Sequence, residues 1–256
     1  MSSIIDNPSS QPLVSRSRRR LTLEFVPGEV QSAMDLDDPH RLVLAYARAM
    51  MCFTLFKPRP AHIVMVGLGG GSMAKFCHRY LPGARITVLE LSAEVIALRE
   101  RFAVPPDSER FRVIHVDAAR HMPRLAGSAD VLLVDGFDAS GLPPALGSAR
   151  FYADCRRALR PDGLLVANVF SYDPHYHVIK RRLRQAFADE VCQFHGIAGN
   201  NHILFALSRD DAGGRPSRAA RLVQRVRQTG ALWPGLAFCN RLLARWVVHR
   251  LRTSQD

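Results

Sequence analysis

The chain lacks paired cysteines and long apolar segments. Its five cysteines are scattered, odd in number and free of any Cys-x-x-Cys spacing, which argues against a zinc site and against a disulfide framework. No run approaches the roughly 18 uninterrupted apolar residues of a membrane span, and residues 1–12 hold no apolar core of a signal peptide. We therefore expect a soluble cytoplasmic protein without a metal site or a transmembrane span.

Two common nucleotide-binding loops are also missing. Residues 63–72 read Ile-Val-Met-Val-Gly-Leu-Gly-Gly-Gly-Ser, and no Gly-Lys-Ser/Thr follows, which excludes a phosphate-binding P-loop. Ser72 stands where a dinucleotide fingerprint needs its last glycine, so NAD and FAD are disfavoured. What remains is a strand and a turn in which Gly67, Gly69 and Gly71 let bare backbone approach a ligand. The alternative is a turn that only joins a strand to a helix.

Acidic residues are in the minority. The chain has 35 Lys and Arg against 23 Asp and Glu, a net charge of +12. Residues 209–256 contain ten arginines and three aspartates, so this tail alone carries +7. Such a surplus favours an anionic partner, yet arginines at helical spacing without interleaved aromatics are also typical of a solvated helix face.

Short β-branched runs alternate with amphipathic segments from residue 63 onward. Strands are predicted near 63–66, 85–90, 111–116, 131–135, 163–170, 191–195 and 202–208, with helices near 72–80, 93–103, 117–124, 148–159 and 175–188. This order predicts an α/β fold with a Rossmann-like, doubly wound, mostly parallel seven-stranded sheet. Only the turn-rich residues 196–201 separate the last two runs, so we expect them to form an antiparallel C-terminal hairpin.

The segments around this core divide the chain further. We expect a disordered basic tail over 1–20, a small N-terminal β-hairpin and a linker helix over 21–60, a cofactor-binding core domain over 61–208, and a basic helical tail over 209–256. The hairpin is predicted from runs at 21–26 and 30–36 that flank Pro27-Gly28. The helix is expected to open at Asp38-Pro39, and the tail to break at Trp233-Pro234.

Acidic residues follow several predicted strands, at the edge of the sheet where ligands gather. Glu90, 23 residues beyond Gly67, is placed to accept hydrogen bonds from ribose hydroxyls. Asp117 could accept from an adenine amino group or cap a helix. Asp135 and Asp138 could face one pocket, one taking a proton from an attacking amine while the other holds a cationic substrate, or they could stabilise an Asx turn.

Taken together, several motifs resemble the spermidine synthase (polyamine aminopropyltransferase) family over about residues 21–208. They are Val-Gly-Leu-Gly-Gly-Gly-Ser, Val-Leu-Glu-Leu-Ser-Ala-Glu-Val-Ile, Val-Asp-Ala, Leu-Val-Asp-Gly-Phe-Asp, and Phe-Tyr-x-x-Cys-x-x-x-Leu-x-Pro-Asp-Gly ending at residue 163. The resemblance implies a class I S-adenosylmethionine-dependent methyltransferase-type fold. It also implies a decarboxylated S-adenosylmethionine donor, a diamine acceptor and a homodimer.

The resemblance also assigns expected roles to residues of this chain. Glu90 would bind the ribose, Asp117 the adenine, and Gln31 would lie near the cofactor. Asp135 would help to deprotonate the attacking amine and Asp138 would anchor the acceptor. Apart from the resemblance, Tyr172 or Tyr176 could wall the acceptor site, and Tyr172 is the candidate substrate-binding residue.

The sequence departs from the family pattern at three places. Gly70 stands where the family's glycine loop carries an acid, and Arg41-Leu42-Val43 stand in place of a Tyr-His/Gln-Glu triplet. Asp135-Gly-Phe-Asp138-Ala replaces Asp-Ser-x-Asp-Pro. Two alternatives follow. One is an S-adenosylmethionine-dependent methyltransferase with an anionic or nucleic-acid acceptor, and the other is a non-catalytic adaptor whose basic C-terminal tail binds an anionic partner.

Overall fold

A seven-stranded sheet forms the centre of the protein. The computed structural model describes residues 11–138, 141–209, 216–229 and 235–254. The strand order is β6-β5-β4-β7-β8-β10-β9. The strands are β4 (His62–Val66), β5 (Arg85–Glu90), β6 (Phe111–His115), β7 (Ala129–Val134), β8 (Leu159–Phe170), β9 (Val191–Gln193) and β10 (Asn201–Ser208). β10 runs antiparallel to both of its neighbours and the other pairs are parallel, which confirms the predicted sheet and its C-terminal hairpin.

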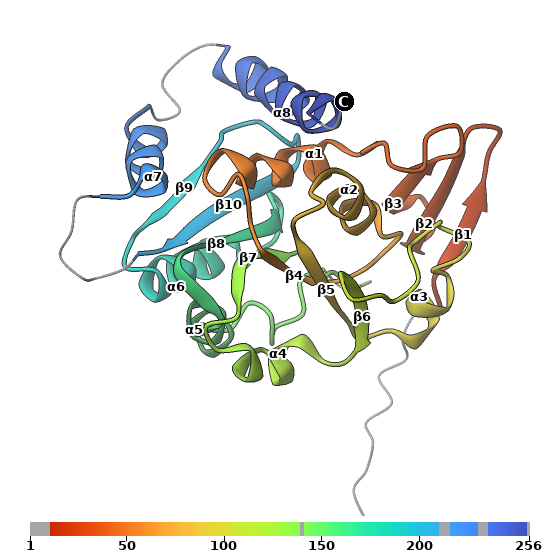
Figure 1. Cartoon of the computed structure of the whole chain (residues 1–256), viewed down its shortest axis with the longest axis horizontal. Helices are drawn as coiled ribbons and strands as arrows, with labels where there is room; N and C mark the ends of the chain where they lie inside the picture. Colours follow the sequence, from red (N-terminus) through yellow and green to blue (C-terminus); the bar gives the residue numbers. More distant parts are fainter. Residues whose placement is uncertain (1–10, 139–140, 210–215, 230–234, 255–256) are drawn as a thin grey trace, which may run out of the picture.

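Helices cover both faces of this sheet (Figure 1). Every residue of β4 and β7 is buried, as expected of central parallel strands that read as continuous apolar runs. One face packs against α2 (Ser72–Tyr80), α3 (Ala93–Ala97) and the helices at either end of the chain. The other face packs against α4 (Ala118–His121), the 3₁₀ helix η2 (Met122–Leu125), α5 (Ala149–Ala158) and α6 (Tyr176–Ala186). The predicted βαβ order is therefore confirmed, although α3 ends before the expected residue 103.

A small antiparallel sheet precedes the core. β2 (Arg20–Val26) and β3 (Glu29–Asp35) form the predicted hairpin, with Gly28 in its turn at φ +85°. β1 (Leu13–Arg16) pairs with β2, so the expectation of a disordered tail over 1–20 is wrong for these residues. Backbone pairing with an open strand edge stabilises β1, and a basic composition does not reveal that pairing. Residues 1–10 of the expected tail lie outside the described residues.

The linker helix begins later than expected. α1 (Ala45–Met50) continues into the 3₁₀ helix η1 (Met51–Leu55), whereas the sequence predicts a start at Asp38-Pro39. The Asp35 carboxylate accepts hydrogen bonds from the backbone amides of Asp37 and Asp38, at 3.0 and 3.3 Å. This side-chain turn competes with helix formation and delays the first helical residue.

The C-terminal tail is helical, as predicted, and α8 is docked on the core. α7 (Arg218–Thr229) and α8 (Leu236–Thr253) both contribute buried residues to the first face of the sheet. Asn240 of α8 donates a hydrogen bond to the carbonyl of His195 at 2.9 Å, and Arg252 pairs with Asp38 at 2.7 Å. The expected break at Trp233-Pro234 lies outside the described residues. Within the described ranges, no helix combines the length and the apolar character needed to cross a bilayer.

A close backbone approach joins the loops that follow β4 and β7. Gly67 directly follows β4 and has φ +91°, and a Cβ placed on it would lie 2.4 Å from the carbonyl oxygen of Asp135. Only glycine therefore allows the two loops to lie this close.

Gly67→Ala should lower the free energy of unfolding by about 2–4 kcal/mol, because it combines left-handed strain with a backbone clash. Urea denaturation followed by circular dichroism measures this loss. The control is Gly83→Ala, which has open space around its Cβ and no positive φ, and should change stability by less than about 0.5 kcal/mol. Equal losses in the two variants would contradict the close approach.

Candidate functional site

A pocket of about 930 Å³ opens at the carboxyl ends of the central parallel strands. The turn after β4 and the loops after β5, β6 and β7 line it from one side, and β3 and α1 of the N-terminal region line it from the other. Nearly all the predicted site residues meet here, namely Gln31, Gly67, Gly69, Glu90, Asp117, Asp135, Asp138 and Tyr172. The remaining one, Gly71, does not line the pocket. It precedes α2 at φ +65°, and a Cβ there would lie 2.4 Å from the Val104 side chain.

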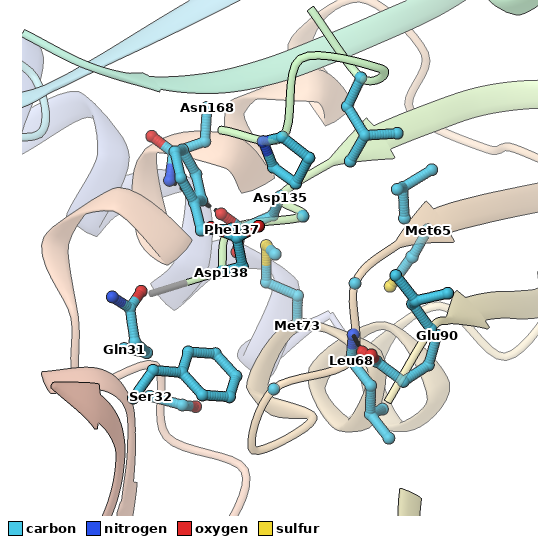
Figure 2. Close-up of a pocket in the computed structure, with 18 of the residues that line it drawn as sticks. Gln31, Ser32, Met65, Leu68, Met73, Glu90, Asp135, Phe137, Asp138 and Asn168 are labelled. Atoms are coloured by element: carbon cyan, nitrogen blue, oxygen red, sulfur yellow. Dashed lines mark hydrogen bonds between the residues drawn. The ribbon is translucent and has the colours of Figure 1, made fainter. Parts of the chain in front are cut away.

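Glu90 ties two of these loops together. One carboxylate oxygen accepts from the backbone amide of Leu68 at 2.7 Å, and the other accepts from that of Ser92 at 2.8 Å. Figure 2 shows the Glu90 side chain reaching the backbone of Leu68. Because each carboxylate oxygen can accept more than one hydrogen bond, Glu90 retains capacity toward a ribose hydroxyl. The carboxylate is thus both a brace of the glycine turn and a candidate ligand group.

The middle of the glycine turn is filled by protein. A Cβ on Gly70 would lie 2.6 Å from the Ser32 hydroxyl and 2.8 Å from the Phe102 ring. No acidic side chain fits at this position unless both neighbours move. The packing of Ser32 and Phe102 therefore favours glycine at this position.

Asp117 caps a helix and also lines the pocket. Its side chain accepts from the backbone amide of Ala119 at 2.8 Å, at the start of α4. The capping alternative is therefore confirmed, and contact with an adenine stays a prediction. The cap uses one carboxylate oxygen and the other lies 3.4 Å from Arg120 Nε, so an adenine amino group would share an oxygen that already has a partner.

Asp135 is held from one side by a chain of amides. The Asn168 side-chain amide donates to the Asp135 carboxylate at 2.8 Å, and Asn201 donates to the Asn168 side-chain oxygen at 3.0 Å. The second bond fixes which end of Asn168 faces Asp135. Asp135 therefore presents its carboxylate in one defined orientation, close to Phe137 and Asp138 (Figure 2).

Tyr46 is a site residue that the sequence reasoning missed. Its hydroxyl lies within hydrogen-bonding reach of the Asp135 carboxylate and 3.1 Å from the backbone oxygen of Gln31, and its single proton is donated to one of the two at a time. Residues 41–43 were expected to stand in place of the family's tyrosine triplet, but Arg41 pairs with Asp35 and does not line this pocket. The available signal was a tyrosine on the apolar face of the linker helix, since a half-buried tyrosine hydroxyl needs a partner.

The electrostatics of Asp135 suit proton transfer. Burial raises its pKa to about 6, although the hydrogen bonds from Asn168 and Tyr46 act in the opposite direction. Burial, together with the Asp135 charge, also raises the pKa of the Tyr46 hydroxyl well above its usual value. At neutral pH Asp135 is therefore mainly ionised, yet it takes up a proton more readily than an exposed aspartate.

Three aromatic rings wall the mouth of the pocket. Phe137 packs on Phe170 with ring centres 4.3 Å apart, and Phe170 stacks on Tyr172 at 5.1 Å. Tyr172 is 67% exposed, so its ring is accessible from solvent. Aromatic faces attract cations and also pack against methylene chains. Asp138 lies beside this wall, where its backbone pairs with Gly141.

Charge in the pocket is of one sign. Six carboxylates line it, those of Glu29, Glu90, Glu94, Asp117, Asp135 and Asp138, and the described lining contains no lysine, arginine or histidine. Across the part of the chain that the structure describes, no group of three or more His, Cys, Asp and Glu side chains is placed to hold a metal ion. The pocket is therefore built for a ligand that carries positive charge.

Comparison with known proteins agrees with this geometry. The Spermine/spermidine synthase domain model matches residues 43–195. A polyamine aminopropyltransferase of Chromobacterium violaceum is 40% identical over 69% of this chain and 68% of its own length. The crystal structure of a probable spermidine synthase from Corynebacterium glutamicum superimposes with a TM-score of 0.68 at 21% identity, covering 86% of this chain and 84% of that one.

A further solved structure is a spermidine synthase in complex with the transition-state analogue AdoDATO. It has a TM-score of 0.56 at 18% identity, covering 92% of this chain and 89% of that one. These two structural likenesses confirm the fold, while the domain match and the Chromobacterium relative establish the family. The chain belongs to the spermine/spermidine synthase family of transferases.

Proposed function

We propose that this protein transfers an aminopropyl group from decarboxylated S-adenosylmethionine to an amine. The observation that carries the proposal is the pocket lined by six carboxylates and, among its described residues, by no cationic side chain. The donor is a sulfonium with a free amine, and the acceptor is a diamine or a longer polyamine. Both are cations, and both gain from this field. Relatives named polyamine aminopropyltransferase support the same reaction.

The turn after β4 forms the seat for the adenosyl group. Gly67 and Gly69 line the pocket there, together with Glu90 and Asp117, which would bind the ribose and the adenine. Gln31 of β3 closes the opposite side of the pocket. The space at Gly70 that would hold a further acid is filled, and the seat carries no cation that could pair with a carboxylate. This charge pattern favours the decarboxylated donor and needs no metal.

Asp135 acts on the acceptor. An amine attacks carbon only when it is neutral, and the ionised Asp135 carboxylate accepts its proton. A carbon–nitrogen bond then forms as the carbon–sulfur bond of the sulfonium breaks, and the thioether leaves with the electron pair. Asp138 holds a second ammonium group, while Phe137, Phe170 and Tyr172 pack along the methylene chain. Because the sulfonium is a good leaving group, the protein mainly has to align and deprotonate the acceptor.

A methyltransferase is the second candidate function, and the filled space at Gly70 favours it. That position is where the family's loop carries an acid near the aminopropyl end of the donor. Without that acid, the discrimination between the two donors depends on the remaining carboxylates. The two reactions are separated by the donor that the pocket prefers.

We further infer a cytoplasmic location, a homodimer and an anionic partner for the basic C-terminal helices. A cytoplasmic location is supported by five free cysteines, of which only Cys239 is exposed. A homodimer is supported by the apolar stripe of Phe238, Leu242 and Trp246, which are 46–59% exposed on α8. The basic helices α7 and α8 support an anionic partner.

Calorimetric titration should show that decarboxylated S-adenosylmethionine binds at least tenfold more tightly than S-adenosylmethionine. The extra carboxylate of the latter is repelled by a pocket that already holds six. Methylthioadenosine, which lacks both the amine and the carboxylate, is the control for the adenosyl seat and should bind measurably. Equal or tighter binding of S-adenosylmethionine would contradict aminopropyl transfer and would support methyl transfer as the reaction.

Asp135→Asn should lower kcat by about 10²–10⁴-fold, because the proton acceptor is lost. The same variant should be more stable at pH 8, by on the order of 2 kcal/mol. A raised folded pKa means that ionised Asp135 costs native stability, with no cost below pH 3.8 and the full cost above about pH 6. Urea denaturation at pH 5 and pH 8 measures the gain, which should be larger at pH 8. The exposed Asp107→Asn is the control, and an equal stability change there would contradict the assignment.

Tyr46→Phe should move the acidic limb of the pH profile of kcat/KM to higher pH. Its hydrogen bond holds the pKa of Asp135 down, so removing the bond raises that pKa above about 6, and activity is lost at a higher pH. Tyr176→Phe is the matched control, since it also removes a half-buried hydroxyl, bonded at 3.2 Å to Gln193, but outside the pocket. An unmoved limb in Tyr46→Phe would show that this hydroxyl has no part in the titration.

A further inference from the structure

A second hollow, of about 1,190 Å³, lies where α8 crosses residues 41–43, α1 and the end of α2. Five arginines and one histidine line it, namely Arg41, Arg48, Arg79, Arg245, Arg252 and His249. Among the residues that the structure describes, no aspartate or glutamate contributes to its lining. We name it the basic pocket. It draws on the N-terminal segment, the core and the C-terminal tail at once, so it exists only because α8 is docked.

Nearby carboxylates compensate only part of this charge. Arg41 pairs with Asp35 at 3.2 Å, and Arg252 pairs with Asp38 at 2.7 Å. The remaining three, Arg48, Arg79 and Arg245, have no carboxylate partner in the described parts of the chain. Five arginines less two aspartates leave a charge of +3 around the hollow, with His249 counted as neutral.

Arg48 is held close to other arginines of the basic pocket. Its guanidinium donates to the carbonyls of Leu42 and Val43, at 2.7 and 2.6 Å, which fixes the side chain but neutralises nothing. Burial and the nearby charges of Arg245 and Arg41 lower its pKa. Like charges held in one partly enclosed hollow repel each other, and a bound anion would remove that repulsion.

We propose that the basic pocket binds a small anion carrying two or more phosphate groups. Several guanidinium groups converging on one hollow match phosphate oxygens, which arginine contacts in a bidentate manner. A charge of about −3 or −4 on a di- or triphosphate balances the uncompensated +3. A single carboxylate would leave most of the repulsion in place.

The shape of the pocket argues against a nucleic-acid strand. A single strand is held by a groove with aromatic faces on which bases stack. Apart from the His249 imidazole, the aromatic ring in the described lining is that of Tyr80, which packs against Phe76 at 4.7 Å and against His40 at 6.4 Å, with the Arg252 guanidinium 5.7 Å from its centre. The recognition is therefore directed at phosphate groups, and it does not depend on the proposed transfer reaction.

Calorimetric titration of the full chain with inorganic triphosphate, in 150 mM salt, tests the site without any turnover. We expect saturable binding of one triphosphate per chain. The double variant Arg79→Gln with Arg245→Gln should raise the Kd at least tenfold. The control is Arg218→Gln with Arg225→Gln, which removes the same charge from exposed positions of α7 outside the pocket and should change the Kd less than twofold. Thermal melting curves check that both double variants fold.

Three results would overturn the proposal. The first is the absence of saturable triphosphate binding to the unmodified chain. The second is an equal loss of affinity in the two double variants, which would show that triphosphate responds only to the net charge of the protein and not to the basic pocket. The third is tighter binding of a single-stranded oligonucleotide than of triphosphate, with the same sensitivity to Arg79 and Arg245, which would make the hollow part of a nucleic-acid surface. Sulfate at matched ionic strength should bind at least tenfold more weakly than triphosphate.

Discussion

The contact of bare backbone at Gly67 with the carbonyl of Asp135 is the constraint on which the reaction site depends. It brings the loops after β4 and β7 together, and Glu90 adds the loop after β5 through its two backbone hydrogen bonds. The loops after β4, β5 and β7, which are far apart in the sequence, thereby form one continuous surface of the pocket. Asp135 can then be surrounded by protein while its carboxylate still faces the pocket, and this burial is what raises its pKa to about 6.

Acidic and basic side chains occupy different parts of the molecule. The chain carries +12, yet the described lining of the reaction pocket holds six carboxylates and no cationic side chain. The acids lie mainly on the strand-end loops and on β3, whereas many of the arginines lie on the outer helices. A net charge describes the field far from the protein, but a ligand in a hollow responds to the groups that line it. The basic composition therefore does not indicate an anionic acceptor, and a polycation is the better match.

The sequence predicts those parts of the fold and of the site that local patterns of residues determine. The central sheet, its hairpin and the gathering of Glu90, Asp117 and Asp135 at one edge follow from apolar periodicity and from the rule that ligands gather at strand ends. Tertiary contacts decide the rest. The partner of the Tyr46 hydroxyl and the packing of Ser32 and Phe102 against Gly70 join segments that no local pattern relates. The pairing of β1 with β2 is a local hairpin across residues 17–19, which the basic composition of this segment does not reveal.

Residues 41–48 form a wall between two hollows of opposite charge. Residues 44–46 face the reaction pocket, whereas residues 41–43 and Arg48 face the basic pocket. Arg48 holds the carbonyls of Leu42 and Val43, and Tyr46 lies one half-turn earlier on the same short helix, in contact with Asp135. The same short segment therefore fixes side chains of both hollows, Arg48 on one side and Tyr46 on the other.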